Sequence, residues 1–115
     1  FKALKAAMEG VDCVFHLAGE VFHTRREDCQ RRMQETNVDG TLMVIRAASV
    51  TKCKVVYASS SGVVACSPNA SAVATDDSPY CTSTVANWPY YMSKITAEQE
   101  ALKLAKERGV PLVVM

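Results

Sequence analysis

Residues 54–61 read KVVYASSS, an apolar stretch that runs directly into three serines. The first part of this stretch, residues 54–58, is rich in β-branched and aromatic side chains, which predicts a β-strand. An apolar run without alternating polar residues is typical of a strand buried on both faces of a parallel sheet. The serines that follow, Ser59, Ser60 and Ser61, then lie at the carboxyl end of the strand, where such sheets bind ligands.

Strands and helices are predicted to alternate on both sides of this stretch. Two further apolar runs predict strands at residues 12–18 and 111–115. Apolar residues at helical spacing predict helices at residues 1–9, 27–50 and 89–108. Strands that alternate with long helices form a parallel sheet flanked by helices, with right-handed crossovers. The sequence therefore predicts the α/β class.

The bulk composition is that of an ordinary globular protein. The chain has 115 residues, of which 49% are hydrophobic and 22% charged, and its formal net charge is +1. This charge gives no sign of a nucleic-acid binder, and no apolar run approaches the roughly 20 residues that cross a bilayer. The five cysteines are odd in number and form no C-x-x-C pair, which favours a reduced, cytoplasmic compartment.

Both ends of the chain and one internal segment have unusual patterns. The helical pattern is already present at residue 1, and the chain stops inside an apolar run, so we expect a fragment of a longer protein. Residues 60–88 are rich in Ser, Thr, Pro and Ala and have no sustained period. A loop of this length is usually functional or disordered.

Residues 89–94 read PYYMSK and place two tyrosines within one turn of a lysine. Tyr90 and Lys94 are four residues apart and share one helix face. A tyrosine has an ordinary pKa of about 10, and a nearby ammonium group lowers it. The pair could therefore exchange protons near neutral pH, and Tyr91 could do the same from three residues away. In isolation, packed tyrosines beside a solvated lysine are the commoner outcome of this spacing.

Three other polar residues fall on the predicted elements. Ser60 could donate a hydrogen bond to a developing alkoxide, or it could be one of three polar residues that simply follow the end of the strand. Asn37 lies on the apolar stripe of the predicted 27–50 helix, where it is either buried with partners or placed at the margin. His16 is more often a core residue than a catalyst in such a position. The sequence has no metal-ligand spacing, phosphate-binding P-loop or nucleophile elbow.

Four motifs occur in one order along the chain: HLAG at 16–19, NVDGT at 37–41, VVYASSSG at 55–62 and YYMSK at 90–94. In this order and spacing the chain resembles the extended short-chain dehydrogenase/reductase family, also called the NAD-dependent epimerase/dehydratase family. The resemblance covers essentially all 115 residues. It implies a Rossmann-type parallel sheet with flanking helices that binds NAD or NADP. It also favours the catalytic interpretations of Ser60, Asn37 and the Tyr90–Lys94 pair over the interpretations in which these residues are only structural or solvated.

The resemblance also implies a role for each motif. Tyr90 would exchange a proton with the substrate, Ser60 would steady the substrate oxygen, and Lys94 would tune the tyrosine and hold the nicotinamide ribose. The Y-x-x-x-K spacing selects Tyr90 over Tyr91, and Ser61 is the alternative to Ser60. The full set of implied catalytic residues is Ser60, Tyr90, Lys94 and Asn37, and the implied cofactor-binding residues are Ala18, Gly19, Ser59, Tyr90 and Lys94.

The chain departs from the family pattern in one respect. It lacks the glycine-rich first turn and the residue that selects NAD or NADP. Residues 1–115 are therefore expected to be the central part of one NAD(P)-binding domain, without its first strands and its carboxy-terminal substrate region. Such a piece should not hold the cofactor well, so the activity is expected of the parent protein.

The residues after the serines bear on the branch of the family. Residues 64–66 are VAC, where nucleotide-sugar epimerases have V-Y-G, and SSSGVVACSPN is closer to dihydroflavonol reductases and 3β-hydroxysteroid dehydrogenases. This resemblance favours an oxidoreductase that interconverts an alcohol and a ketone on a hydrophobic or phenolic small molecule. The alternatives are a nucleotide-sugar epimerase or dehydratase and a non-catalytic dinucleotide-sensing protein. The family also suggests a homodimer through the two long helices.

Overall fold

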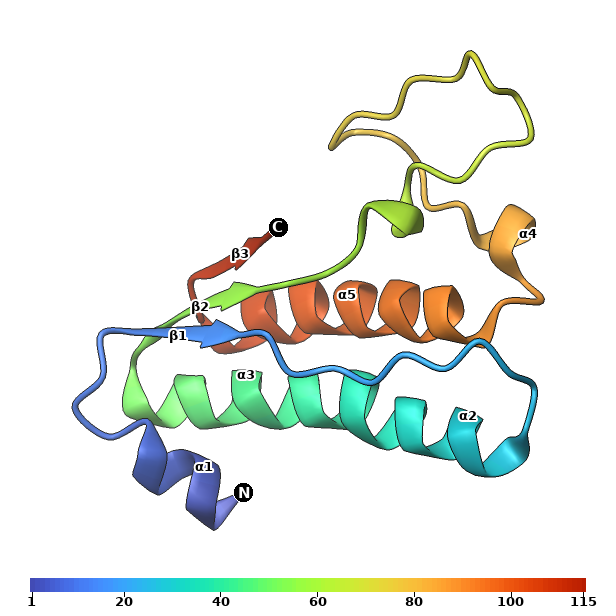
Figure 1. Ribbon diagram of the computed structural model, residues 1–115. Helices are drawn as coiled ribbons and strands as arrows, with labels where there is room; N and C mark the ends of the chain where they lie inside the picture. Colours follow the sequence, from blue (N-terminus) through green and yellow to red (C-terminus); the bar gives the residue numbers. More distant parts are fainter.

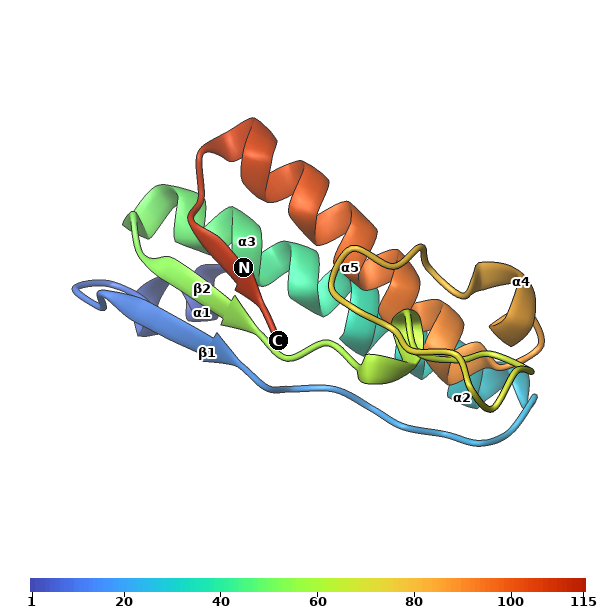
Figure 2. The same cartoon turned by 90° about the horizontal axis from the view of Figure 1, so that it is seen from above.

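The computed structural model describes residues 1–115 as a three-stranded parallel sheet with helices against one face (Figures 1 and 2). The strands are β1 (Cys13–His16), β2 (Lys54–Tyr57) and β3 (Leu112–Val114), in the spatial order β1-β2-β3. Cys13 pairs with Lys54 at the start of β1, and Val55 pairs with Leu112 at the start of β3. The predicted α/β architecture is confirmed.

Two long helices cover the sheet. They are α3 (Gly40–Thr51) and α5 (Pro89–Arg108), which lie side by side in both views. The shorter α1 (Lys2–Ala7) packs against α3. The largest buried cluster fills the space between these helices and the sheet, and it comprises Met8, Val44, Ile45, Ala47, Ala48, Cys53, Val55, Ala101, Ala105 and Val110.

The predicted 27–50 helix is continuous, but it is not one regular α-helix. It consists of α2 (Glu27–Met33), the π-helical turn η1 (Gln34–Asp39) and α3. The widened turn carries Asn37, whose backbone oxygen accepts a hydrogen bond from the Thr41 hydroxyl at 2.6 Å. Spacing of apolar residues could not have predicted this turn, because the stripe passes through it unbroken. Such turns are frequent at functional sites.

The ends of the other elements are close to the predicted ones. Strand β1 ends at His16, two residues earlier than predicted, so Ala18 and Gly19 belong to the irregular segment that follows. Helix α5 begins at Pro89 and ends before Gly109, as predicted, and the φ of +65° at Gly109 is the left-handed cap that glycine favours. The 60–88 segment contains two short helices, η2 (Ser61–Val63) and α4 (Thr82–Val85), around a projecting loop.

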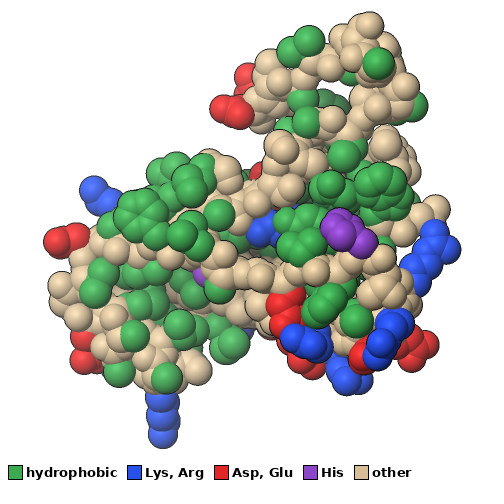
Figure 3. Space-filling view, in the orientation of Figure 1, with side chains coloured by type: hydrophobic (Ala, Val, Ile, Leu, Met, Phe, Trp, Pro, Cys, Tyr) green, Lys and Arg blue, Asp and Glu red, His purple; other side chains and the backbone are tan.

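The second face of the sheet is uncovered. Phe15 on β1 is 64% exposed and Val113 on β3 is 60% exposed. Figure 3 shows hydrophobic side chains gathered over the strands on the viewed face. None of the helices is long and apolar enough to cross a membrane.

Candidate active site

The predicted site residues converge at the carboxyl edge of the sheet. The segments after β1 and β2 and the first turns of α5 meet there, because parallel strands present their carboxyl ends to one edge. Two hydrogen bonds tie these segments together. The Lys94 ammonium reaches the end of β2, and the Asn37 amide reaches α5.

Lys94 is a buried cation. Only 5% of the residue is exposed, its Nζ donates to the Ala58 carbonyl oxygen at 2.7 Å, and it lies 4.6 Å from the centroid of the Tyr57 ring. Burial lowers the pKa of this amine, and the charge of Glu98 opposes that shift. An ammonium group has three N–H donors, so Lys94 keeps donors that no other residue takes. The solvated alternative is therefore wrong for this lysine.

Asn37 links three segments of the chain. It is 1% exposed, and its Nδ2 donates to the Glu20 carbonyl oxygen and to Ser93 Oγ, each at 2.9 Å. Its Oδ1 accepts from the Glu20 backbone N–H at 2.8 Å. Ser93 Oγ in turn donates to the Tyr90 carbonyl oxygen at 2.7 Å. The buried interpretation of Asn37 holds, and the amide fixes the first turn of α5 relative to the segment after β1.

Gly19 lies beside this amide. A Cβ atom at this position would lie 3.4 Å from Asn37 Oδ1, at the lower limit of ordinary van der Waals contact. The segment after β1 therefore runs past the amide with room for a methyl group at this position.

His16 is a hydrogen-bonded core residue, as predicted. It is 7% exposed, its ring stacks on Tyr57 with centroids 5.5 Å apart, and its Nε2 lies 2.8 Å from Thr41 Oγ1. The Thr41 hydroxyl hydrogen is committed to the Asn37 carbonyl, so the Thr41 oxygen accepts from His16 Nε2–H. The chain His16–Thr41–Asn37 therefore ties β1 to the π-helical turn.

This arrangement predicts acid sensitivity. Burial and the charge of Lys94 lower the pKa of His16 below its ordinary value of 6.5. Below pH 6.5 the His16 side chain binds a proton more readily in the unfolded chain than in the folded chain. The free energy of unfolding therefore falls as the pH drops through that range. We expect the free energy of unfolding of the full-length protein, measured with a denaturant, to be lower at about pH 5.5 than at about pH 7.5. These two values lie about one unit on either side of the ordinary histidine pKa of 6.5.

The histidine variants separate this effect from general acid denaturation. His16→Asn should flatten the pH dependence, whereas His23→Gln, which removes the other histidine of the chain, should retain it. An unchanged slope in His16→Asn would contradict the assignment.

Ser60 caps the amino end of the short helix η2. Its Oγ accepts a hydrogen bond from the Gly62 backbone N–H at 3.3 Å. Gly62 lies directly against the ring of Tyr91, since a Cβ atom there would be 2.1 Å from Tyr91 Cε1. The Tyr91 ring also packs on Trp88, with centroids 5.5 Å apart. Tyr91 therefore packs beneath the segment that carries Ser60, which agrees with its predicted role as a neighbour of the reacting tyrosine.

Gly62→Ala should displace this ring. The added methyl group cannot fit beside Tyr91 in its present rotamer, and overpacking of this kind costs about 1–3 kcal/mol. We expect a lower urea midpoint for the full-length Gly62→Ala protein. A smaller residue opposite the methyl should relieve the clash, so the cost of Gly62→Ala should shrink in a Tyr91→Leu background. Equal costs in both backgrounds would argue against the contact.

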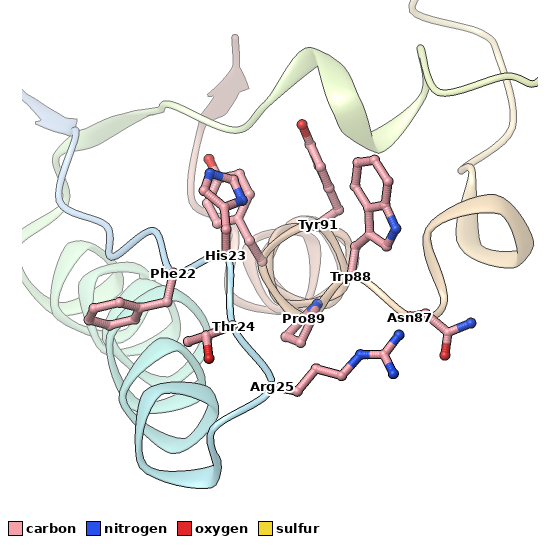
Figure 4. Close-up of a pocket in the computed structure, with 9 residues that line it drawn as sticks. Phe22, His23, Thr24, Arg25, Asn87, Trp88, Pro89 and Tyr91 are labelled. Atoms are coloured by element: carbon pink, nitrogen blue, oxygen red, sulfur yellow. The ribbon is translucent and has the colours of Figure 1, made fainter.

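The structure does not bring all predicted residues into contact. No hydrogen bond joins Ser60 to Tyr90 or to Lys94. Ser60 lines a hollow of about 490 Å³ that Glu98 and Met115 also border. Tyr90 lines a separate pocket of about 390 Å³. Figure 4 shows the rings of His23, Trp88 and Tyr91 extending to the same side of the start of α5; the pocket is lined by Phe22, His23, Thr24, Arg25, Asn87, Trp88, Pro89, Tyr90 and Tyr91.

Glu98 is a site residue that sequence reasoning missed. It accepts hydrogen bonds from Ser59 Oγ and from the Tyr80 hydroxyl, the latter at 3.0 Å. Burial and this carboxylate raise the pKa of Tyr80 to about 12. Glu98 thereby joins the end of β2, the long loop and α5. Its position one helical turn after Lys94 was the available signal, and Ser59, predicted to touch a cofactor, has this carboxylate as its partner.

Both the sequence and the fold of this chain resemble those of known proteins. The sequence model of the NAD dependent epimerase/dehydratase family matches residues 1–115. Cinnamoyl-CoA reductase 1 of Arabidopsis thaliana is 42% identical over 122 aligned residues, which cover 100% of this chain and 33% of the relative. A bifunctional dihydroflavonol 4-reductase/flavanone 4-reductase of Pyrus communis is 29% identical, with 95% of this chain and 33% of the relative covered. The chain thus spans about a third of the length of these curated relatives.

A solved structure of similar fold is the dTDP-glucose 4,6-dehydratase of Streptomyces venezuelae with NAD bound. It superposes with a TM-score of 0.82 at 26% identity, and the match covers 98% of this chain and 34% of that chain. The resemblance inferred from the four motifs is confirmed by the family match, and the fold by this superposition.

Proposed function

Because the chain belongs to the NAD-dependent epimerase/dehydratase family, we propose that the protein acts with NAD or NADP to interconvert an alcohol and a ketone by hydride transfer. The observation that carries the proposal is the buried Lys94 ammonium, one helical turn after Tyr90, with donors left over from its bond to Ala58. A buried cation without a carboxylate partner is costly. Ribose hydroxyls would satisfy it.

Residues 1–115 form the central part of one NAD(P)-binding domain. Two observations support this extent. The relatives are about three times as long as the matched region, and one face of the sheet leaves Phe15 and Val113 exposed. Parallel sheets are normally covered on both faces, so the rest of the domain packs there.

The residues present fit a dinucleotide. Lys94 offers N–H donors to the nicotinamide ribose, and Ala18 and Gly19, which follow β1 at the same edge of the sheet, match the turn that lies along the adenosine side. Ser59 lies at the same strand end, although its hydroxyl is bonded to Glu98. When bound, the nicotinamide supplies or accepts the hydride.

The chain's own residues handle the proton and the substrate oxygen. The Tyr90 hydroxyl passes a proton to the substrate oxygen or removes it. Ser60 donates to that oxygen as negative charge develops. Asn37 acts through Ser93 to hold the turn that carries Tyr90. Because the only hydrogen bond of Ser60 Oγ is the one it accepts from Gly62, its hydroxyl hydrogen is free to turn toward a substrate.

The reaction class has a direct test. The full-length protein with a ketone or aldehyde of an aromatic compound should change the absorbance of NADH or NADPH in proportion to product. Nucleotide sugars should be inert. Product from a nucleotide sugar without net cofactor turnover would instead establish the alternative function, an epimerase or dehydratase, which the dTDP-glucose 4,6-dehydratase similarity favours. The named reductases among the sequence relatives favour the oxidoreductase.

A third possibility is a sensor that binds the dinucleotide without turnover. Such a protein does not require Ser60, Tyr90 and Lys94 together. The sensor is therefore the least favoured of the three candidate functions. The five free cysteines fit a reducing, cytoplasmic compartment.

We also propose that the protein forms a homodimer through α3 and α5. Val50 on α3 is 51% exposed and Leu102 on α5 is 43% exposed. A charge at the interface should separate the subunits, so Leu102→Glu is expected to halve the mass of the full-length protein in sedimentation experiments. Glu100→Lys, another exposed change on α5, is the matched control.

A further inference from the structure

Two cysteines meet at the base of the projecting loop. The backbone N–H of Cys66 donates to Cys81 Sγ at 3.2 Å, and the backbone N–H of Cys81 donates to the Val63 carbonyl oxygen at 2.8 Å. The loop therefore leaves and returns at one place, on top of η2 (Figure 1). No other cysteine sulfur of the chain has a hydrogen bond to another cysteine.

The contact is compatible with a disulfide. A disulfide requires Cα atoms about 4.4–6.8 Å apart. The Cys66 nitrogen is one bond from its own Cα, and the Cys81 sulfur is two bonds from its Cα. The 3.2 Å contact between these atoms therefore limits how far apart the two Cα atoms can lie. The link requires rotation about side-chain bonds and a movement of the loop base that brings the two sulfur atoms together.

The two thiols are also accessible. Cys66 and Cys81 are half-buried, whereas Cys53 is buried. Both border a hollow of about 310 Å³ on the loop side, which Ser67, Ser83 and Thr84 also line. A small disulfide can approach the pair from this side without opening the core.

We propose that Cys66 and Cys81 form a thiol pair that reacts with a low-molecular-weight disulfide, such as glutathione disulfide, to give an intramolecular disulfide. One thiol loses its proton and attacks a sulfur of glutathione disulfide, which releases one glutathione thiol and leaves a mixed disulfide. The second cysteine displaces the other glutathione. Two protein thiols are oxidised, the small disulfide is reduced to two thiols, and the protons pass to them.

The link would close the loop between Ser60 and Tyr90. Val63 and Val85, which flank the two cysteines, pack with Ile95 of α5 in one small cluster. Oxidation would therefore fix the base of the loop against the helix that carries the proposed acid–base residue. Disulfides in reducing compartments are usually transient and redox-sensing, which fits a pair that forms without unfolding.

The test is chemical and needs no turnover, so its outcome is independent of the proposed function. Full-length protein is equilibrated with glutathione and glutathione disulfide, quenched with an alkylating agent and digested without reduction. We expect mass spectrometry to find a peptide that joins Cys66 to Cys81, with the fraction joined independent of protein concentration. Separate glutathione adducts at the two cysteines, or two alkylated thiols at high glutathione disulfide, would overturn the proposal.

Single variants complete the experiment. Cys66→Ser should leave Cys81 as a persistent glutathione adduct, because no second thiol can displace the glutathione. Cys29→Ser, a half-buried cysteine on α2, should retain the linked peptide. Oxidation should raise the melting temperature of the wild type and of Cys29→Ser but not that of Cys66→Ser. An equal shift in all three proteins would count against the pair.

Discussion

Tyr90→Phe in the full-length protein is expected to lower turnover by about 10²–10⁴-fold, the usual contribution of a positioned acid–base group. The change removes one hydroxyl and retains the ring that packs edge-on against Tyr91, with centroids 5.2 Å apart. Cofactor binding should therefore remain, because the ribose contacts proposed for Lys94 are untouched. Stopped-flow or steady-state absorbance of NAD(P)H, together with a cofactor titration, measures both quantities.

Tyr91→Phe is the matched control. Its ring lies against Gly62 and Trp88, and this packing does not depend on the hydroxyl. We expect a change in turnover of a few-fold at most. A larger loss in Tyr91→Phe than in Tyr90→Phe would reverse the choice of tyrosine, and unchanged turnover in both would favour the dinucleotide sensor.

Lys94→Met is the second change with a large expected effect. It removes the buried ammonium that donates to Ala58 and retains a flexible chain of similar length. Hydrogen bonds from charged groups contribute about 1.5–3 kcal/mol, so loss of the proposed ribose contact should weaken cofactor binding by about 10–100-fold. Turnover should fall further, since a cofactor without the proposed ribose contact is poorly positioned for hydride transfer.

Stability separates this loss from misfolding. Burial lowers the pKa of Lys94, which means that the folded chain disfavours the charged amine at neutral pH. Lys94→Met removes this unfavourable burial together with the bond to Ala58, two effects of opposite sign, so the variant is expected to remain folded. Lys103→Met, an exposed lysine on the same helix, should alter neither melting nor cofactor affinity. A Lys94→Met protein that binds cofactor normally would contradict the ribose assignment.

The sequence predicted the elements because they follow local patterns. The run at 54–58 has a strand composition, and the helix that starts at Pro89 has a glycine cap at Gly109. Spacing placed Asn37 on an apolar stripe and Lys94 on the face of Tyr90, but it left the burial of both side chains open. Both side chains are buried in the structure.

The remaining features depend on contacts between distant segments, which no local pattern encodes. The residues around Glu98 in the sequence give no sign of its role. Its hydrogen-bond partners, Ser59 and Tyr80, lie in other segments of the chain and meet it only in the folded structure. The approach of Cys66 to Cys81 arises because the loop returns to its starting point. The catalytic roles proposed for Ser60 and Tyr90 rest on the motifs, because no hydrogen bond connects the two residues.

The π-helical turn at Gln34–Asp39 has a consequence for the phase of the helix around it. Each residue of a regular α-helix advances it by about 100°, whereas a π-helical turn takes up an extra residue within one wider turn. A single deletion at Glu35 should therefore restore regular α-helical geometry and leave α2 in its present phase. Arg32 would then keep its contact with Glu20. A deletion within α2 itself has no such wide turn to absorb it, so the chain should tolerate the loss of one residue at the π-helical turn better than the loss of one residue in α2.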